Sequence, residues 1–173
     1  MFKRWFGFAM LNILMFVLAM VLAPVLPLFA IGRDALPAWL SWFQTPDNGL
    51  DGDANFKANV APFKGEQVGW RRYVNRIRWL WRNPAYGFDI SVLGFALAAE
   101  TKVQTVGTRE FSGALKTGWF FALAINADGS MAWQFYAVKV WGARASRVDF
   151  GWKLWGDPGV CQYALSVNPW LTV

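Results

Sequence analysis

The longest apolar pattern lies at the start of the chain. Residues 7–31 contain no charged side chain over 25 positions, and Asn12 is the only strongly polar one. A helix that crosses a hydrocarbon core about 30 Å thick needs roughly 20 residues. Pro24 and Pro27 predict that the helix ends near Ala23, because proline disrupts a regular helix. The pattern predicts an N-terminal transmembrane helix.

Two other interpretations of this segment stay open. A signal peptide has a similar basic start, here Lys3 and Arg4, but a shorter apolar core of about 7–15 residues and a small-x-small cleavage site. Residues 28–30 fit such a site poorly, because Leu28 is bulky. The segment would also suit the buried core helix of a soluble protein. We expect an uncleaved anchor, because the apolar run has the length of a span.

Tryptophans lie on both sides of the apolar run. Trp5 precedes it, and Trp39 and Trp42 follow it. Indole rings favour the membrane–water interface, because they are apolar with one polar group. The alternative is that one apolar face of a short soluble helix is formed by Leu36, Trp39, Leu40 and Phe43, since they have helical spacing.

Residues 44–66 are rich in Pro, Gly, Asn and Asp and predict a linker. Asp47, Asp51 and Asp53 suggest a calcium loop, but their spacing does not fit the twelve-residue pattern of oxygen ligands. We therefore expect surface turns and no metal site.

Residues 68–89 predict an amphipathic helix that stops at Asn83, because Pro84 disfavours helical geometry in the residue before it. One face is apolar and contains Trp70, Tyr73, Val74, Ile77 and Trp81. Another face is basic and contains Arg71, Arg78 and Arg82, with Arg72 and Arg76 beside it.

Three interpretations of this helix remain. It lies on an anionic membrane surface, with Trp70, Trp79 and Trp81 at the interface and the five arginines toward headgroups. It binds nucleic acid through arginine–phosphate and aromatic–base contacts. Or its aromatic face packs on the following sheet and its arginines are solvated, which is the ordinary structural interpretation.

The pattern changes after residue 90. Segment 90–99 is apolar but too short for a second span. Residues 102–106 alternate with period two, and segments 119–125 and 132–141 flank an Asp-Gly turn, which predicts a hairpin. Two further strand patterns follow at 147–155 and 162–167.

These elements predict an α+β fold with an N-terminal transmembrane helix, an Arg/Trp-rich helix and a C-terminal antiparallel sheet that forms a sandwich or small barrel. We expect a membrane anchor and interfacial segment over residues 1–43, a linker over 44–66, and the Arg/Trp helix plus β domain over 67–173.

Composition supports the membrane class. Of 173 residues, 55% are hydrophobic and only 16% charged, against about 25% charged in average soluble proteins. Twelve tryptophans imply that some line an interface or, alternatively, that a small core is aromatic-rich. The net charge of +6 is distributed in blocks of +3, −3, +4 and +2 over residues 1–33, 34–66, 67–89 and 90–173, and the block boundaries are candidate domain boundaries.

Candidate catalytic groups are few. The chain contains no histidine, which excludes Ser-His and Cys-His pairs and His-ligated metal sites, and a lone cysteine, Cys161, which excludes an intrachain disulfide. Neither a phosphate-binding loop nor a dinucleotide fingerprint occurs, and nothing distinguishes the carboxylates as an acid–base pair. We expect a non-enzymatic protein without a cofactor.

One motif carries a resemblance. The string WLWRNPAYGFD at residues 79–89, with FGWKLWG at 150–156, resembles a family of small, mostly uncharacterised proteins of tailed bacteriophages. The resemblance implies a phage origin and a bacterial host envelope. It implies no catalytic residues, because no activity is assigned to that family.

The sequence therefore predicts a membrane-anchored phage accessory protein whose β domain binds a partner at the host envelope. Basic residues before the apolar run predict a cytoplasmic N-terminus in the host inner membrane. Expected partners are the lipid bilayer, other phage or host envelope proteins and further copies of the chain. The alternatives are a virion structural protein, whose apolar N-terminus packs between subunits, and, less favoured, a protein that binds nucleic acid or a host factor.

Overall fold

The computed structural model describes residues 2–65, 67–110, 116–154 and 159–172. The chain forms two compact units. The first, which we call the sheet unit, contains Met1–Ala9 and Leu93–Val173. The second, the helical unit, contains Met10–Val92. The first residues of helix α1 (Phe2–Leu22) belong to the sheet unit, and the remainder of this helix belongs to the helical unit.

The helical unit follows the proline pattern of the sequence. Helix α1 ends at Leu22, as Pro24 predicts, and the 3-10 helix η1 (Leu26–Ala30) has Pro27 in its first turn. A second 3-10 helix, η2 (Ala38–Phe43), and a π-helical turn, η3 (Phe56–Val60), come next. Helices α2 (Gly69–Arg82) and α3 (Tyr86–Ser91) complete the unit. The predicted end of α2 at Asn83 is confirmed, because Asn83 caps the helix.

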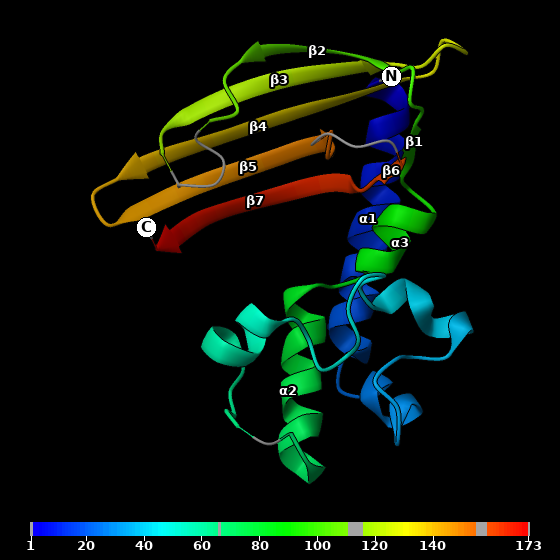
Figure 1. The fold of residues 1–173 in the computed structure, drawn as a ribbon, viewed down its shortest axis with the longest axis vertical. Helices are drawn as coiled ribbons and strands as arrows, with labels where there is room; N and C mark the ends of the chain where they lie inside the picture. Colours follow the sequence, from blue (N-terminus) through cyan, green and yellow to red (C-terminus); the bar gives the residue numbers. More distant parts are fainter. Residues whose placement is uncertain (1, 66, 111–115, 155–158, 173) are drawn as a thin grey trace. The chain divides into compact units, whose positions relative to one another are not determined.

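The sheet unit contains two antiparallel sheets. The larger one has the strand order β2-β3-β4-β5-β7 (Figure 1). Its strands are β2 (Lys102–Gly107), β3 (Gly118–Ile125), β4 (Met131–Trp141), β5 (Arg144–Trp152) and β7 (Tyr163–Thr172). The smaller sheet pairs β1 (Phe95–Leu97) with β6 (Gly159–Cys161). The α+β class and the C-terminal antiparallel sheet are therefore confirmed. The arrangement is sandwich-like, and the alternative of a closed barrel is wrong, because β2 and β7 lie at the edges of an open sheet.

The predicted hairpin joins β3 and β4. Ile125 pairs with Met131, so the turn comprises residues 126–130. Gly129 has a φ of 81°, which a residue without a side chain adopts at little cost. The carboxylate of Asp128 accepts hydrogen bonds from the backbone N–H and the hydroxyl of Ser130, at 2.8 and 2.6 Å. Local turn chemistry thus fixes the register of these two neighbouring strands.

The start of α1 packs on one face of the larger sheet. The Trp5 ring lies 5.3 Å from that of Trp133 and stacks on that of Tyr163 at 6.0 Å. The Trp5 indole N–H donates to the Ala164 carbonyl, and the Tyr163 hydroxyl donates to the Trp5 carbonyl. Trp152 is fully buried beneath this layer. Part of the tryptophan excess therefore builds an aromatic core, as one of the two compositional interpretations predicts.

The compact units have other boundaries than the predicted domains. Helix α2 belongs with residues 44–66 in the helical unit, whereas the prediction grouped it with the β domain. Segment 44–66 contains η3 and the buried side chains of Leu50 and Phe56. This segment, predicted as a linker, supplies part of the core of the helical unit.

Candidate membrane interface

Helix α1 is the one helix among the described residues that is long and apolar enough to cross a membrane. Only 11% of the apolar 18-residue stretch within this helix is buried. Large apolar side chains form its open side along the helical unit and point away from the rest of that unit: Met10, Ile13, Leu14, Val17 and Val21. This open side has the helical spacing of a continuous strip about three turns long.

The buried side of α1 includes small and polar residues next to the half-buried Met15 and Leu22. Ala19 is buried within the helical unit, and so is Ala23, one residue past the helix. The Asn12 amide donates a 2.7 Å hydrogen bond to the Asp89 carboxylate in α3. A soluble amphipathic helix turns its bulky apolar side inward and its polar side outward. Helix α1 has the reverse arrangement, which is typical of helices that pack through small residues in lipid.

Helix α2 does not bury the face that the sequence predicts. The predicted apolar face has Trp70 and Trp81 exposed and its other members half-buried. The buried side is instead formed by Asn75, Arg76, Trp79 and Leu80. The expectation that an aromatic face packs and all five arginines are free is therefore wrong. The physical reason is that Arg76 finds enough partners to be buried.

Asp51 provides the charge that buries Arg76. Its carboxylate accepts from the Arg76 Nε at 2.7 Å and from Arg72 in a bidentate pair at 2.9 and 2.5 Å. The remaining Arg76 N–H groups donate to the carbonyls of Ala30 and Arg33, at 2.9 and 2.7 Å. Desolvation by burial raises the pKa of Asp51, but the hydrogen bonds from Arg72 and Arg76 outweigh it and lower this pKa to about 2.

The structure thus divides the five predicted anion-binding arginines. Arg72 and Arg76 are occupied by Asp51. Arg71, Arg78 and Arg82 are exposed, and within the described part of the chain none of the three has a hydrogen bond or ion pair. Sequence reasoning missed Asp51 as a partner, although the −3 block that contains it directly precedes the +4 block of α2.

The six tryptophans predicted at the membrane interface also fall into two groups, one exposed and one packed inside a unit. Trp39, Trp42, Trp70 and Trp81 are exposed in the helical unit, with Trp39 at 70%. Trp79 is 3% exposed and packs edge-to-face on Phe56 at 5.0 Å. Trp5 is half-buried against the sheet. The first four are therefore available to an external surface, whereas the packing of Trp79 and Trp5 is internal to their units.

The 36–43 segment combines both interpretations given to it. Leu36, Leu40 and Phe43 are buried, as expected of the apolar side of a short helix. Trp39, predicted on the same face, is exposed instead, and so is Trp42; both belong to η2. Trp42 also makes an edge-to-face contact with Phe88 at 5.5 Å, so this exposed ring is held in place.

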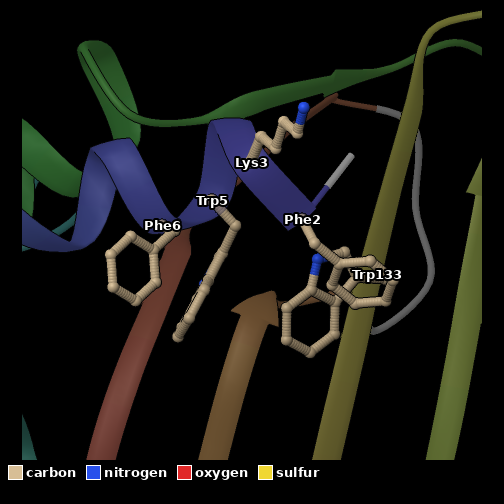
Figure 2. Close-up of a pocket in the computed structure, with 5 residues that line it drawn as sticks. All are labelled: Phe2, Lys3, Trp5, Phe6 and Trp133. Carbon is tan, nitrogen blue, oxygen red and sulfur yellow. The ribbon is translucent and has the colours of Figure 1, made fainter.

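A separate cavity of about 480 Å³ lies in the sheet unit, between the start of α1 and β4 (Figure 2). Phe2, Trp5, Phe6 and Trp133 form its apolar walls, and Lys3 stands at its edge. The Trp133 indole N–H is buried and has no acceptor among the described residues. The ring centroids of Phe2 and Trp133 lie 5.0 Å apart.

The described titratable groups offer little catalytic chemistry. No cluster of three or more His, Cys, Asp or Glu side chains is placed among the described residues to hold a metal ion. Burial raises the pKa of the Cys161 thiol, which disfavours the reactive thiolate. Burial also raises the pKa of Asp149, which accepts a 2.8 Å hydrogen bond from Gln134. This buried pair lies within the larger sheet, where Asp149 is in register with Tyr136 and Ser166 on the neighbouring strands.

The fold defines a class, namely an α+β protein whose described residues include one helix that is long and apolar enough to cross a membrane. The chain belongs to a family of unknown function, DUF7338, whose model matches residues 1–172. No curated protein and no solved structure matches the chain.

Proposed function

We propose that this protein is a non-enzymatic, membrane-anchored accessory protein. Helix α1 is the anchor, and the sheet unit is the part that binds a protein partner. The resemblance of residues 79–89 to tailed-phage proteins supports a phage origin and the inner membrane of the bacterial host as the site of action. The absence of histidine and of any nucleophile–base motif in the sequence supports the non-enzymatic part of the proposal.

The proposal rests on the arrangement of α1, in which bulky apolar side chains are exposed and small side chains are buried. Burying a Val or Leu side chain is worth roughly 1.5–3 kcal/mol. The open side chains Leu14, Val17 and Val21 are 63%, 52% and 68% exposed, so water would contact most of their surface. A hydrocarbon phase removes this cost. Ala19 and Ala23, which are buried, leave room for close approach of the helical unit without covering the open side.

Contacts of α1 support its retention in the mature protein. Trp5 and Phe8 pack on Tyr163 in the sheet unit, and the carbonyl of Met20 accepts from Trp81 in the helical unit. Removal of α1 as a signal peptide would strip both units of these partners. A cleaved signal peptide makes no such contacts in the mature fold.

Membrane fractionation of the full-length protein tests the anchor. We expect the wild-type chain in the membrane pellet after an alkaline carbonate wash, and the double variant Ile13→Lys/Val17→Lys in the supernatant. The matched control is Ala54→Lys/Ala58→Lys, which adds the same charge at exposed positions of the helical unit and should stay in the pellet. A wild-type protein recovered as a detergent-free, soluble monomer would contradict the proposal.

A virion structural role is the second candidate, because other copies of the chain can cover the same apolar strip. Obligate subunit interfaces are more apolar than ordinary surfaces. Mass spectrometry of purified particles separates the two: stoichiometric copies in virions favour assembly, and a membrane pool absent from particles favours the anchor.

A further inference from the structure

The outward surface of α2 has two adjacent stripes. Arg71, Arg78 and Arg82 follow a spacing of seven and four residues, so they lie on one line along the helix. We call them the cationic stripe. Trp70 and Trp81 lie on the neighbouring line, eleven residues apart, and are 63% and 40% exposed. Both stripes belong to the helical unit, so their arrangement is internal to one compact body.

Among the described residues, no ion pair compensates the charge of the cationic stripe. The Asp51 carboxylate pairs with Arg72 and Arg76 on the other side of α2. No described acidic side chain forms an ion pair with the stripe. Three guanidinium groups that repel one another over a few helical turns are stabilised by an external anion.

Trp70 and Trp81, which we call the tryptophan stripe, are held in place beside the cationic stripe. The Trp81 indole N–H donates to the Met20 carbonyl at 3.0 Å, and the Trp70 ring packs edge-to-face on Phe63 at 4.6 Å. Each ring is fixed on one side and open on the other. Fixed, half-open indole rings beside cations are the pattern of a protein surface at the headgroup level of a bilayer.

Helix α2 is attached at the C-terminal end of α1. Trp81 binds the carbonyl of Met20, and the Tyr73 hydroxyl donates to the carbonyl of Pro24. Both acceptors lie where the apolar helix gives way to the segment after it. If α1 is in lipid, as proposed above, the C-terminal end of this helix is the place where phosphate groups begin.

We infer that the cationic stripe binds the phosphate groups of anionic phospholipids, with Trp70 and Trp81 inserted between neighbouring headgroups. This inference rests on the proposed membrane anchor and adds the lipid class. Nucleic acid fits less well, because base stacking needs free ring faces along an open groove. Here each ring is packed on one side, and the neighbouring side chains Val74 and Ile77 are half-buried.

Vesicle binding by the purified full-length protein tests the inference. The probes are phosphatidylcholine vesicles with and without phosphatidylglycerol, at low and high salt. Wild-type protein should bind both kinds and prefer the anionic one, and the preference should fall with salt. The triple variant Arg71→Gln/Arg78→Gln/Arg82→Gln should lose on the order of 100-fold of that preference, at about 1 kcal/mol for each arginine.

A matched variant removes the same charge elsewhere in the helical unit. Arg33→Gln/Lys57→Gln/Lys64→Gln changes three exposed cations outside the stripe and should retain most of the anionic preference. Equal loss in both triple variants would overturn the inference in favour of general charge attraction. A wild-type protein without anionic preference, or one that prefers a single-stranded RNA oligonucleotide to anionic vesicles, would also overturn it.

The two proposals fail in different ways. Binding to phosphatidylcholine alone depends on α1 and should be the same in wild type and both triple variants. If neutral vesicles are not bound but anionic ones are, the anchor fails and the cationic stripe stands. If neutral vesicles are bound without anionic preference, the anchor stands and the stripe fails.

Discussion

Asp51 holds two arginines of the helical unit in place. It compensates the 4% exposed Arg76 and also binds Arg72. We expect Asp51→Asn to lower the free energy of unfolding by about 3 kcal/mol, because a buried arginine then loses its counter-charge. Thermal unfolding in a mild detergent measures the change. The exposed Asp47→Asn should change it by less than about 0.5 kcal/mol, and equal effects of the two variants would refute the assigned role.

The same carboxylate predicts an acid dependence of stability. The pKa of Asp51 falls from 3.8 to about 2 on folding, so its ionised form stabilises the folded state above pH 4. This contribution, about 2 kcal/mol, is lost as the pH falls from 3.8 to about 2. Unfolding of wild type and Asp51→Asn over this range should show the loss in the wild type only. If the free energies of unfolding of the two proteins change with pH in parallel, the stabilising role of the Asp51 ion pairs is contradicted.

Gly151 shows a second residue-level constraint, in the sheet unit. It lies in β5 with a φ of 103°, and a Cβ there would come within 1.9 Å of the Trp133 carbonyl oxygen. Gly151→Ala should cost more than about 3 kcal/mol, because the neighbouring strand must move. Gly129→Ala, in the open hairpin turn at φ 81°, should cost only about 1 kcal/mol. Denaturant unfolding measures both variants. Gly151→Ala reports on the steric clash together with the backbone strain, and Gly129→Ala reports on the backbone strain alone.

At the scale of elements, the first two turns of α1 act as part of the sheet core. Trp5→Ala removes contacts with Trp133 and Tyr163 and a hydrogen bond to Ala164, and should destabilise the sheet unit by about 3 kcal/mol. Phe6→Ala is the control, because Phe6 is 67% exposed and should change stability by less than about 0.5 kcal/mol. Near-UV circular dichroism melting follows the aromatic packing. A neutral Trp5→Ala would mean that Trp5 is an interface residue, as the sequence suggested.

Element boundaries were largely predictable from the sequence because their causes are local. Proline terminates α1 and α2, and the Asp-Gly turn sets the β3–β4 hairpin. The orientation of α2 was not predictable from its own residues. Arg76 is buried because a distant carboxylate and two carbonyls meet it, and those partners lie 25 or more residues away in the chain.

At the scale of the whole molecule, opposite charge blocks pair rather than separate. The acidic block 34–66 and the basic block 67–89 fold into one unit through Asp51. A change in charge sign along a sequence therefore marked an interaction within a unit, not a boundary. The sequence points to the residue types of the candidate site, namely tryptophans and arginines near an apolar helix. Only the structure separates the exposed tryptophans and arginines from those that hold the fold together.

The central claim is that the open side of α1 faces hydrocarbon. A nitroxide on Val17→Cys, in a Cys161→Ser background and reconstituted into vesicles, measures this directly through relaxation by molecular oxygen and by a water-soluble nickel complex. We predict strong relaxation by oxygen and weak relaxation by nickel at residue 17, and the reverse for a label on exposed Ala58→Cys. A residue-17 label that the nickel complex reaches freely, or that neither reagent reaches, would contradict the account.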